Sequence, residues 1–190
     1  MILIFLGPPG AGKGTQAKFV SEKFHLPHLS TGQILRDRLS TNDKKSETIK
    51  KTMDSGELVS DEILNSIISE RIVKKDCFNG FILDGYPRTI NQTLYLENEF
   101  KKNKYKLNFI LEINIKEESI LKRIKSRALV ESRGDDEEHI IKTRLSKYYA
   151  DTKPVSEYYK KNYSLLYNFI KGDLEIDRIR DEILNLLKNH

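Results

Sequence analysis

The sequence predicts an α/β protein in which helices flank one five-stranded parallel sheet. Short apolar runs of strand length alternate with segments whose apolar residues recur at helical spacing. A glycine-rich stretch joins the first apolar run to the first helical segment, and a carboxylate ends the third run. The predicted strands are residues 2–6, 27–30, 81–84, 107–113 and 164–170. The predicted helices are residues 13–24, a helix from 30 or 31, then 44–55, 61–75, 116–127, 135–149, a helix from 154 and a final helix ending at 188.

Length and composition favour a single domain over residues 1–190, with a hydrophobic share of 38%, a charged share of 32% and a mean hydropathy of -0.55. No apolar run is long enough to cross a membrane, and the first leads straight into the glycine-rich stretch. We therefore expect a first strand in place of a signal peptide, and a cytoplasmic protein. The single Cys77, expected to be buried, excludes an internal disulfide and a four-cysteine zinc site. The net charge is +5, but the lysines are scattered without a tract, which disfavours nucleic acid as the main partner.

Residues 7–15 read Gly-Pro-Pro-Gly-Ala-Gly-Lys-Gly-Thr, and they predict a phosphate-binding loop. Glycines let backbone N–H groups converge on an anion, and the following helix directs its positive end to the same place. Lys13, which we expect to face solvent in the empty loop, adds a full charge. The spacing matches a P-loop except at its last position, where Gly14 replaces the hydroxyl residue and Thr15 follows. We expect a nucleoside triphosphate here, with Mg²⁺ held by water, phosphate and a carboxylate from elsewhere.

Residues 80–92 carry the second strong signal. Asp84 ends a predicted buried strand, so it lies in the crevice where open α/β sheets bind ligands, and it can hold Mg²⁺ through water. Gly85 permits a close backbone approach. Arg88 and Gln92 are spaced by one helical turn, which predicts that they share a face.

A second phosphate ligand is predicted near residues 30–36. Ser30 or Thr31 is expected to cap the helix that begins there, with Arg36 one turn inside it. Leu58 and Val59 lie between two later helices and are candidates to line a slot for a nucleobase.

Four arginines bracket a short polar stretch, residues 128–132, which is the candidate hinge and lid: Arg123, Arg127, Arg133 and Arg144. Arg123 and Arg127 are spaced to share a helix face, which is repulsive without an anion. A closing lid would carry such arginines onto bound phosphates. His25 and His28 have no partners at ligand spacing, so we interpret them as turn or solvent-facing residues. Four tyrosines are interpreted as packing residues: Tyr148, Tyr149, Tyr158 and Tyr159.

With these motifs in this order, the chain resembles the adenylate kinases nearly from end to end. The loop ending Gly-Lys-Gly-Thr and the Asp-Gly-Tyr-Pro-Arg segment with its downstream glutamine are specific to that family among P-loop proteins. The resemblance implies a P-loop kinase that transfers the γ-phosphoryl group of ATP to AMP, with Mg²⁺ and without zinc, as a monomer. It also implies an NMP-binding insertion at residues 30–59 and a short lid at residues 127–134. Gln33 stands where the family usually has an aspartate that orders metal-bound water, which puts the metal preference in question.

The resemblance also implies site residues by position. The residues implied to bind ATP are Gly10, Ala11, Gly12, Lys13, Gly14, Thr15, Arg123, Arg127 and Gly172. Those implied to bind AMP are Thr31, Arg36, Leu58, Val59, Gly85, Arg88, Gln92, Arg133 and Arg144. Those implied to act on the transferring group are Lys13, Arg88, Arg127, Arg133 and Arg144, with Asp84 on the metal through water.

The sequence leaves two alternative functions open. A UMP or CMP kinase would share the fold and mechanism, but those families usually carry alanine and asparagine where this chain has Thr31 and Gln92. A non-catalytic P-loop module that regulates a partner would not need the full set of arginines.

Overall fold

The sheet has five parallel strands, in the order β2-β3-β1-β4-β5. In the computed structural model, residues 1–40, 44–120, 122–124 and 138–188 are described, with the side chains of residues 44, 45 and 138 left aside. The strands are β1 (Ile2–Leu6), β2 (His28–Ser30), β3 (Phe81–Asp84), β4 (Leu107–Asn114) and β5 (Tyr167–Lys171). The predicted α/β class and five-stranded parallel sheet are therefore confirmed.

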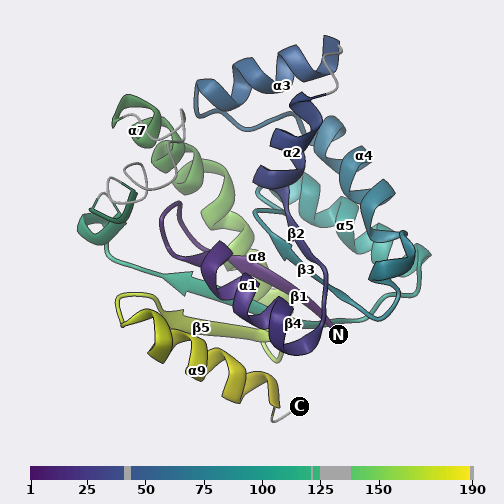
Figure 1. Cartoon of the computed structure of the whole chain (residues 1–190), viewed down its shortest axis with the longest axis vertical. Helices are drawn as coiled ribbons and strands as arrows, with labels where there is room; N and C mark the ends of the chain where they lie inside the picture. Colours follow the sequence, from purple (N-terminus) through teal and green to yellow (C-terminus); the bar gives the residue numbers. More distant parts are fainter. Residues whose placement is uncertain (41–43, 121, 125–137, 189–190) are drawn as a thin grey trace.

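Helices cover both faces of the sheet (Figure 1). They are α1 (Lys13–Phe24), α2 (Thr31–Leu39), α3 (Lys44–Asp54), α4 (Asp61–Ile72), α5 (Ile90–Lys102), α7 (Glu138–Lys147), α8 (Lys153–Asn162) and α9 (Ile176–Lys188). Residues 117–120 and 122–124 are also helical. In Figure 1, α1 and α9 lie in front of the strands and α8 lies behind them, while α2 and α3 stand at one end.

Strand residues alternate between two apolar clusters, one on each face. Leu3 and Phe5 of β1 belong to the cluster that α1 and α9 complete, whereas Ile4 and Leu6 belong to the cluster that α4, α5 and α8 complete. Because both faces are covered, the strands read in the sequence as continuous apolar runs without polar alternation. Cys77 is fully buried in the second cluster, as expected from its type.

The predicted boundaries were wrong at the start of β5 and at the end of α4. The strand expected at residues 164–170 begins at Tyr167, because the N–H groups of Leu166 and Tyr167 both donate to the carbonyl of Tyr163 in a turn. The helix expected to reach residue 75 ends at Ile72 and is followed by a 3₁₀ turn, Lys75–Cys77.

Helix α7 leads directly into α8 through a π-helical segment, Tyr148–Thr152, where two separate helices were expected. Pro154 has no N–H and occupies the first turn of α8, a position where a helix tolerates the missing donor. Tyr148 and Tyr159 are buried, in keeping with the packing role expected of them, but the ring of Tyr149 is exposed. Within the described residues, no helix is both long and apolar enough to span a bilayer.

Candidate active site

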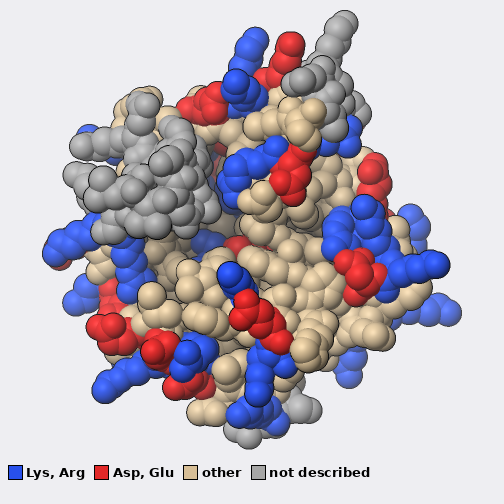
Figure 2. Space-filling view, in the orientation of Figure 1, with Lys and Arg blue, Asp and Glu red and all other residues tan. Residues whose placement is uncertain are grey.

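A cavity of about 960 Å³ opens where strands β1, β2 and β3 end. The space-filling view shows the hollow in the middle of this face, with basic side chains at its edge (Figure 2). Its volume lies at the upper end of the usual range for ligand sites. The predicted site residues that line it are Gly10, Ala11, Gly12, Lys13, Gly14, Thr15, Thr31, Arg36, Leu58, Val59, Asp84, Gly85, Arg88, Arg123 and Arg144. Gln92 and Gly172 are not among the lining residues, and Arg127 and Arg133 lie outside the described residues.

The glycine-rich loop turns sharply between β1 and α1. Gly10 and Gly12 have φ angles of 77° and 90°, a region that favours glycine, and a Cβ at Gly7 would collide with the backbone oxygen of Ile113. Helix α1 begins at Lys13, so its first N–H groups point toward the space that the loop encloses. The loop therefore has the backbone shape of an anion site.

Lys13 is already held by this loop, which corrects the expectation that it faces solvent. Its Nζ donates to the carbonyl oxygens of Gly7 and Pro8, both at 2.8 Å. These two hydrogen bonds hold the ammonium group and its charge inside the loop.

Asp84 is placed against the loop at the end of β3, with 11% of its side chain exposed. His28 Nε2 lies 3.1 Å from its Oδ2, so the interpretation of His28 as a turn or solvent-facing residue was wrong. Burial raises the pKa of this carboxyl, but the His28 hydrogen bond and the charges of Lys13 and Arg88 outweigh it, so the pKa of Asp84 lies below its usual value. The site therefore keeps a carboxylate beside the phosphate loop.

Thr31 and Gly85 fit closely together at the next strand end. Thr31 Oγ1 donates to the carbonyl of Asp84 at 3.0 Å, so this hydroxyl joins the start of α2 to the end of β3 and does not cap α2 as expected. The helix follows Ser30, whose side chain makes no capping hydrogen bond either. Gly85 has a φ angle of 81°, and a Cβ there would lie 2.5 Å from Thr31 Oγ1.

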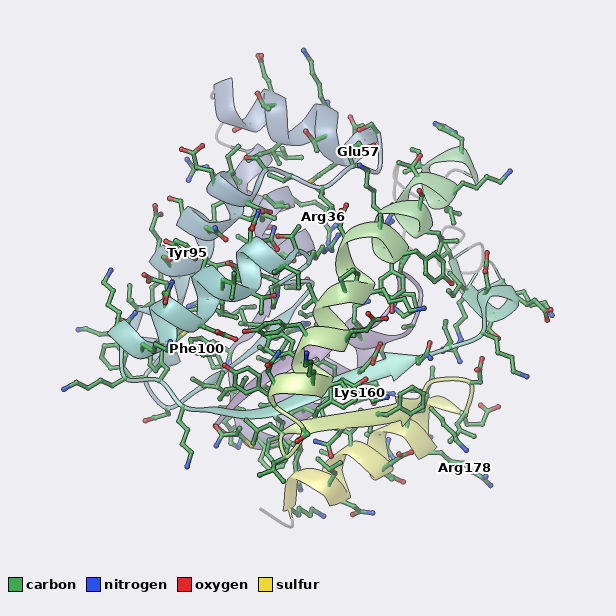
Figure 3. The ribbon with its side chains drawn as sticks, turned by 180° about the vertical axis from the view of Figure 1, so that it is seen from behind. Arg36, Glu57, Tyr95, Phe100, Lys160 and Arg178 are labelled. Atoms are coloured by element: carbon green, nitrogen blue, oxygen red, sulfur yellow. The ribbon has the colours of Figure 1, made fainter. Side chains whose placement is uncertain are left out.

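Arg36 lies on α2 and faces the cavity over Gly32. Its Nη2 donates to Gln33 Oε1 at 3.2 Å, while Gln33 Nε2 donates to Asp37 Oδ1 at 2.7 Å. Figure 3 places Arg36 and Glu57 at the same end of the molecule, away from Phe100 on α5. A guanidinium on this side of Asp84 can hold a second phosphate group.

Arg88 precedes the helix on which it was expected. Helix α5 begins at Ile90 and is capped by Thr89 Oγ1, which accepts from the Gln92 N–H at 3.1 Å. Arg88 Nε donates to the Gly85 carbonyl at 2.8 Å, and the Arg88 N–H donates to Gln92 Oε1 at 2.7 Å. The guanidinium therefore reaches the cavity from a loop, while the Gln92 side chain is fully buried behind it.

The far side of the cavity is formed by residues that follow β4 and β5 and by α7. Arg123 Nη2 donates to the Gly172 carbonyl at 2.7 Å, which brings together two residues predicted to contact ATP. Arg144 lines the cavity one turn before Lys147, whose Nζ lies 2.8 Å from Glu57 Oε2.

Sequence reasoning missed several residues that line this site: His28, Glu57, Lys147, Thr152 and Asp173. The loop from Asp173 to Ile176 follows a predicted strand end, which is a signal that could have found it. The other residues reach the site through contacts between segments that are far apart in the sequence. Among the described residues, no three His, Cys, Asp or Glu side chains gather in a group that could hold a metal directly.

Comparison with known proteins gives consistent results. The family model described as adenylate kinase matches residues 5–164. The chain is similar to the adenylate kinase of Agrobacterium fabrum, at 41% identity over 99% of this chain and 98% of that protein. It is also similar to adenylate kinases of Leptospira biflexa, at 44% identity over 83% of this chain and 85% of that protein, and Petrotoga mobilis, at 38% over 100% and 98%.

Proposed function

Since the chain belongs to the adenylate kinase family, we propose that the cavity described above is where it transfers the γ-phosphoryl group of ATP to AMP, giving two ADP. One observation carries this proposal. A single cavity is lined by the glycine loop with Lys13, which follows β1, and by Arg36 on α2, which follows β2. Asp84 ends β3, the strand that lies between β1 and β2 in the sheet. Two nucleotides bound there would meet through their phosphates.

On the ATP side, we propose that residues 10–15 bind the phosphates through backbone N–H groups and the Lys13 ammonium. Lys13 would exchange the carbonyls of Gly7 and Pro8 for phosphate oxygens. Arg123 would lie against the adenine, close to the backbone of Gly172 and held by its hydrogen bond to that carbonyl.

On the AMP side, we propose that Arg36 and Arg88 bind the phosphate and that Thr31 and Gly85 shape the site beneath it. Leu58 and Val59 line the cavity and would contact the base. Gln92 would pair with the Watson–Crick edge of adenine. Because Gln92 is buried and does not line the cavity, this pairing requires the wall beside it to move when AMP binds.

The transfer needs positioning and charge compensation more than covalent help from the protein. Arg88 and Arg144 line the same cavity, and guanidinium groups bind phosphate oxygens bidentately while remaining charged. By resemblance, Arg127 and Arg133 would join them from the proposed short lid at residues 127–134. Exclusion of water by the lid and by the proposed NMP-binding insertion, residues 30–59, would prevent hydrolysis of ATP.

The residues present fit a magnesium ion bound through water. Mg²⁺ retains several waters and takes one or two carboxylates together with substrate phosphates, and Asp84 supplies one carboxylate of lowered pKa beside the phosphate loop. Bound there, the ion would neutralise charge on the phosphates that are being transferred. That the protein carries no structural zinc, acts as a monomer and is cytoplasmic stay predictions, for which elemental analysis, sedimentation and cell fractionation are the measurements.

A coupled assay for ADP formed from ATP and Mg²⁺, with and without AMP, tests the proposal. ADP that forms only when AMP is present, at two ADP per ATP consumed, supports it. Faster turnover with UMP or CMP would assign the site to a pyrimidine nucleotide, and binding without turnover would indicate a regulatory module.

A further inference from the structure

Asp61, the first residue of α4, bonds two residues that follow Arg88 although it does not line the cavity. Its Oδ1 accepts from Gln92 Nε2 at 2.7 Å, and its Oδ2 accepts from Thr89 Oγ1 at 3.0 Å. One carboxylate therefore links the start of α4 to the start of α5.

These contacts determine which way round the Gln92 amide sits. A carboxylate only accepts hydrogen bonds, so the amide nitrogen must face Asp61. The Arg88 N–H only donates, so the amide oxygen must face it, and the distance of 2.7 Å agrees. The two contacts leave one N–H on Nε2 and one lone pair on Oε1 for another partner.

The remaining Nε2 N–H and Oε1 lone pair of Gln92 are complementary to adenine and not to guanine. On its Watson–Crick edge, adenine offers an amino donor and a ring acceptor, to which Oε1 and the Nε2 N–H are complementary. Guanine offers a carbonyl acceptor and a ring N–H donor at the same places, which would meet like groups. Gln92 is fully buried, so a reversed amide would leave unpaired groups without access to water.

We propose that Asp61 is a positioning residue for the choice of nucleobase, because its carboxylate holds the Gln92 amide in the orientation that accepts adenine and rejects guanine. The proposal rests on the role proposed above for Gln92 at the AMP base. Asp61 also orients the Thr89 hydroxyl, whose oxygen caps α5, so the experiment must separate specificity from stability.

The test replaces Asp61 by leucine, which has a similar shape and no acceptor, and by asparagine, which keeps one acceptor oxygen. Glu62→Leu is the matched control, since it removes an exposed carboxylate from the same first turn of α4. For each variant, kcat/KM is measured with AMP and with GMP, together with KM for ATP and the Tm.

Asp61→Leu should narrow the preference for AMP over GMP by about tenfold, the effect of one lost hydrogen bond in a buried site. The change should come from kcat/KM for AMP, with KM for ATP unaltered. Asp61→Asn should return most of the preference, because its oxygen can face Gln92, and Glu62→Leu should leave it at the wild-type value.

An unchanged AMP to GMP ratio in Asp61→Leu, with only a lower Tm, would overturn the proposal and leave Asp61 a structural role. Gln92→Ala separates the proposal that Asp61 orients the Gln92 amide from the proposal that Gln92 pairs with the base. If it narrows the ratio while Asp61→Leu does not, the Asp61 proposal alone is wrong. If neither variant moves the ratio, Gln92 does not read the base. Asp61→Ala replaces the leucine variant should the latter not fold.

Discussion

Gly85→Ala tests the close fit between the second and third strand ends. The φ angle of Gly85 is 81°, and an added Cβ would lie 2.5 Å from Thr31 Oγ1 and 3.0 Å from Arg88 Nη2. Arginine has a flexible end that can move away. The Thr31 hydroxyl is fixed by its hydrogen bond to the Asp84 carbonyl, so it must break that bond to make room.

Two costs add in this variant. An alanine in the left-handed region costs roughly 1–2 kcal/mol, and the lost hydrogen bond leaves a buried carbonyl unpaired at about 1–3 kcal/mol. The free energy of unfolding should therefore fall by about 2–5 kcal/mol. For a domain of this size each kcal/mol lowers the Tm by roughly 2–4 °C, which gives a decrease of about 4–20 °C.

Urea titration and thermal melts measure the stability, and steady-state kinetics measure the function. Because Thr31 and Gly85 are proposed to shape the AMP site, KM for AMP should rise more than KM for ATP. Gly14→Ala is the stability control, since its added Cβ would make only an ordinary 3.4 Å contact with Asp84 Oδ2. Its free energy of unfolding should stay within about 1 kcal/mol of wild type.

The double variant Thr31→Ala, Gly85→Ala decides whether the clash is the cause. Removing Oγ1 relieves the contact, so the double variant should be more stable than the sum of the single effects predicts, by at least about 0.5 kcal/mol. Additive effects, or a Gly85→Ala variant within about 1 kcal/mol of wild type, would refute the reasoning.

Three other predictions follow from the site and the core. Lys13→Met should lower kcat by about 10² or more, because the variant lacks the charge that would meet the phosphates. It should also lower the free energy of unfolding by roughly 1–2 kcal/mol, because Nζ donates to two loop carbonyls. Near-normal turnover would contradict the role of Lys13 in transfer. Asp84→Asn should make the free energy of unfolding less dependent on pH in the acid range. The lowered pKa of Asp84 stabilises the wild type above about pH 3.9, and this contribution is lost as pH falls through the folded-state value; urea midpoints at several acidic pH values will show it, and parallel curves would exclude it. Cys77 should react with a disulfide reagent only after unfolding, because burial raises its pKa to about 11; fast labelling of the native protein would be inconsistent with this.

The strands could be predicted because the information for each is local. A strand buried on both faces is a short apolar run in the sequence. The positive φ angles at Gly10 and Gly12 are indicated by the residue type, because glycine favours them. The carboxyl-end position of Asp84 follows from the same run. By contrast, the helix boundaries at Ile72 and Ile90 depended on turns and caps that several local sequences could have formed.

The contacts of His28 and Lys13 could not be predicted in this way. His28 meets a carboxylate 56 residues later, because β2 pairs with β3 in a register that sets Ser30 opposite Asp84. Periodicity indicates that two strands exist, but it does not give their order or register. The orientation of Lys13 depends on carbonyls that turn inward only once the loop has closed.

The departure of the loop from the usual P-loop pattern has a structural counterpart at Asp84. A Cβ at position 14 would point at Asp84 Oδ2 from 3.4 Å, so this carboxylate occupies the neighbourhood that a hydroxyl at position 14 would reach. Its Oδ2 also contacts His28, and its carbonyl accepts from Thr31. In the proposed site, the protein group that holds the metal would therefore be Asp84 at the end of β3 and not a hydroxyl of the loop. Strand β3 pairs with both β1 and β2, the strands that lead to the two phosphate-binding sides. A side chain that extends beyond Cβ at position 14 would meet the same carboxylate, so the identities of these two residues should be physically coupled.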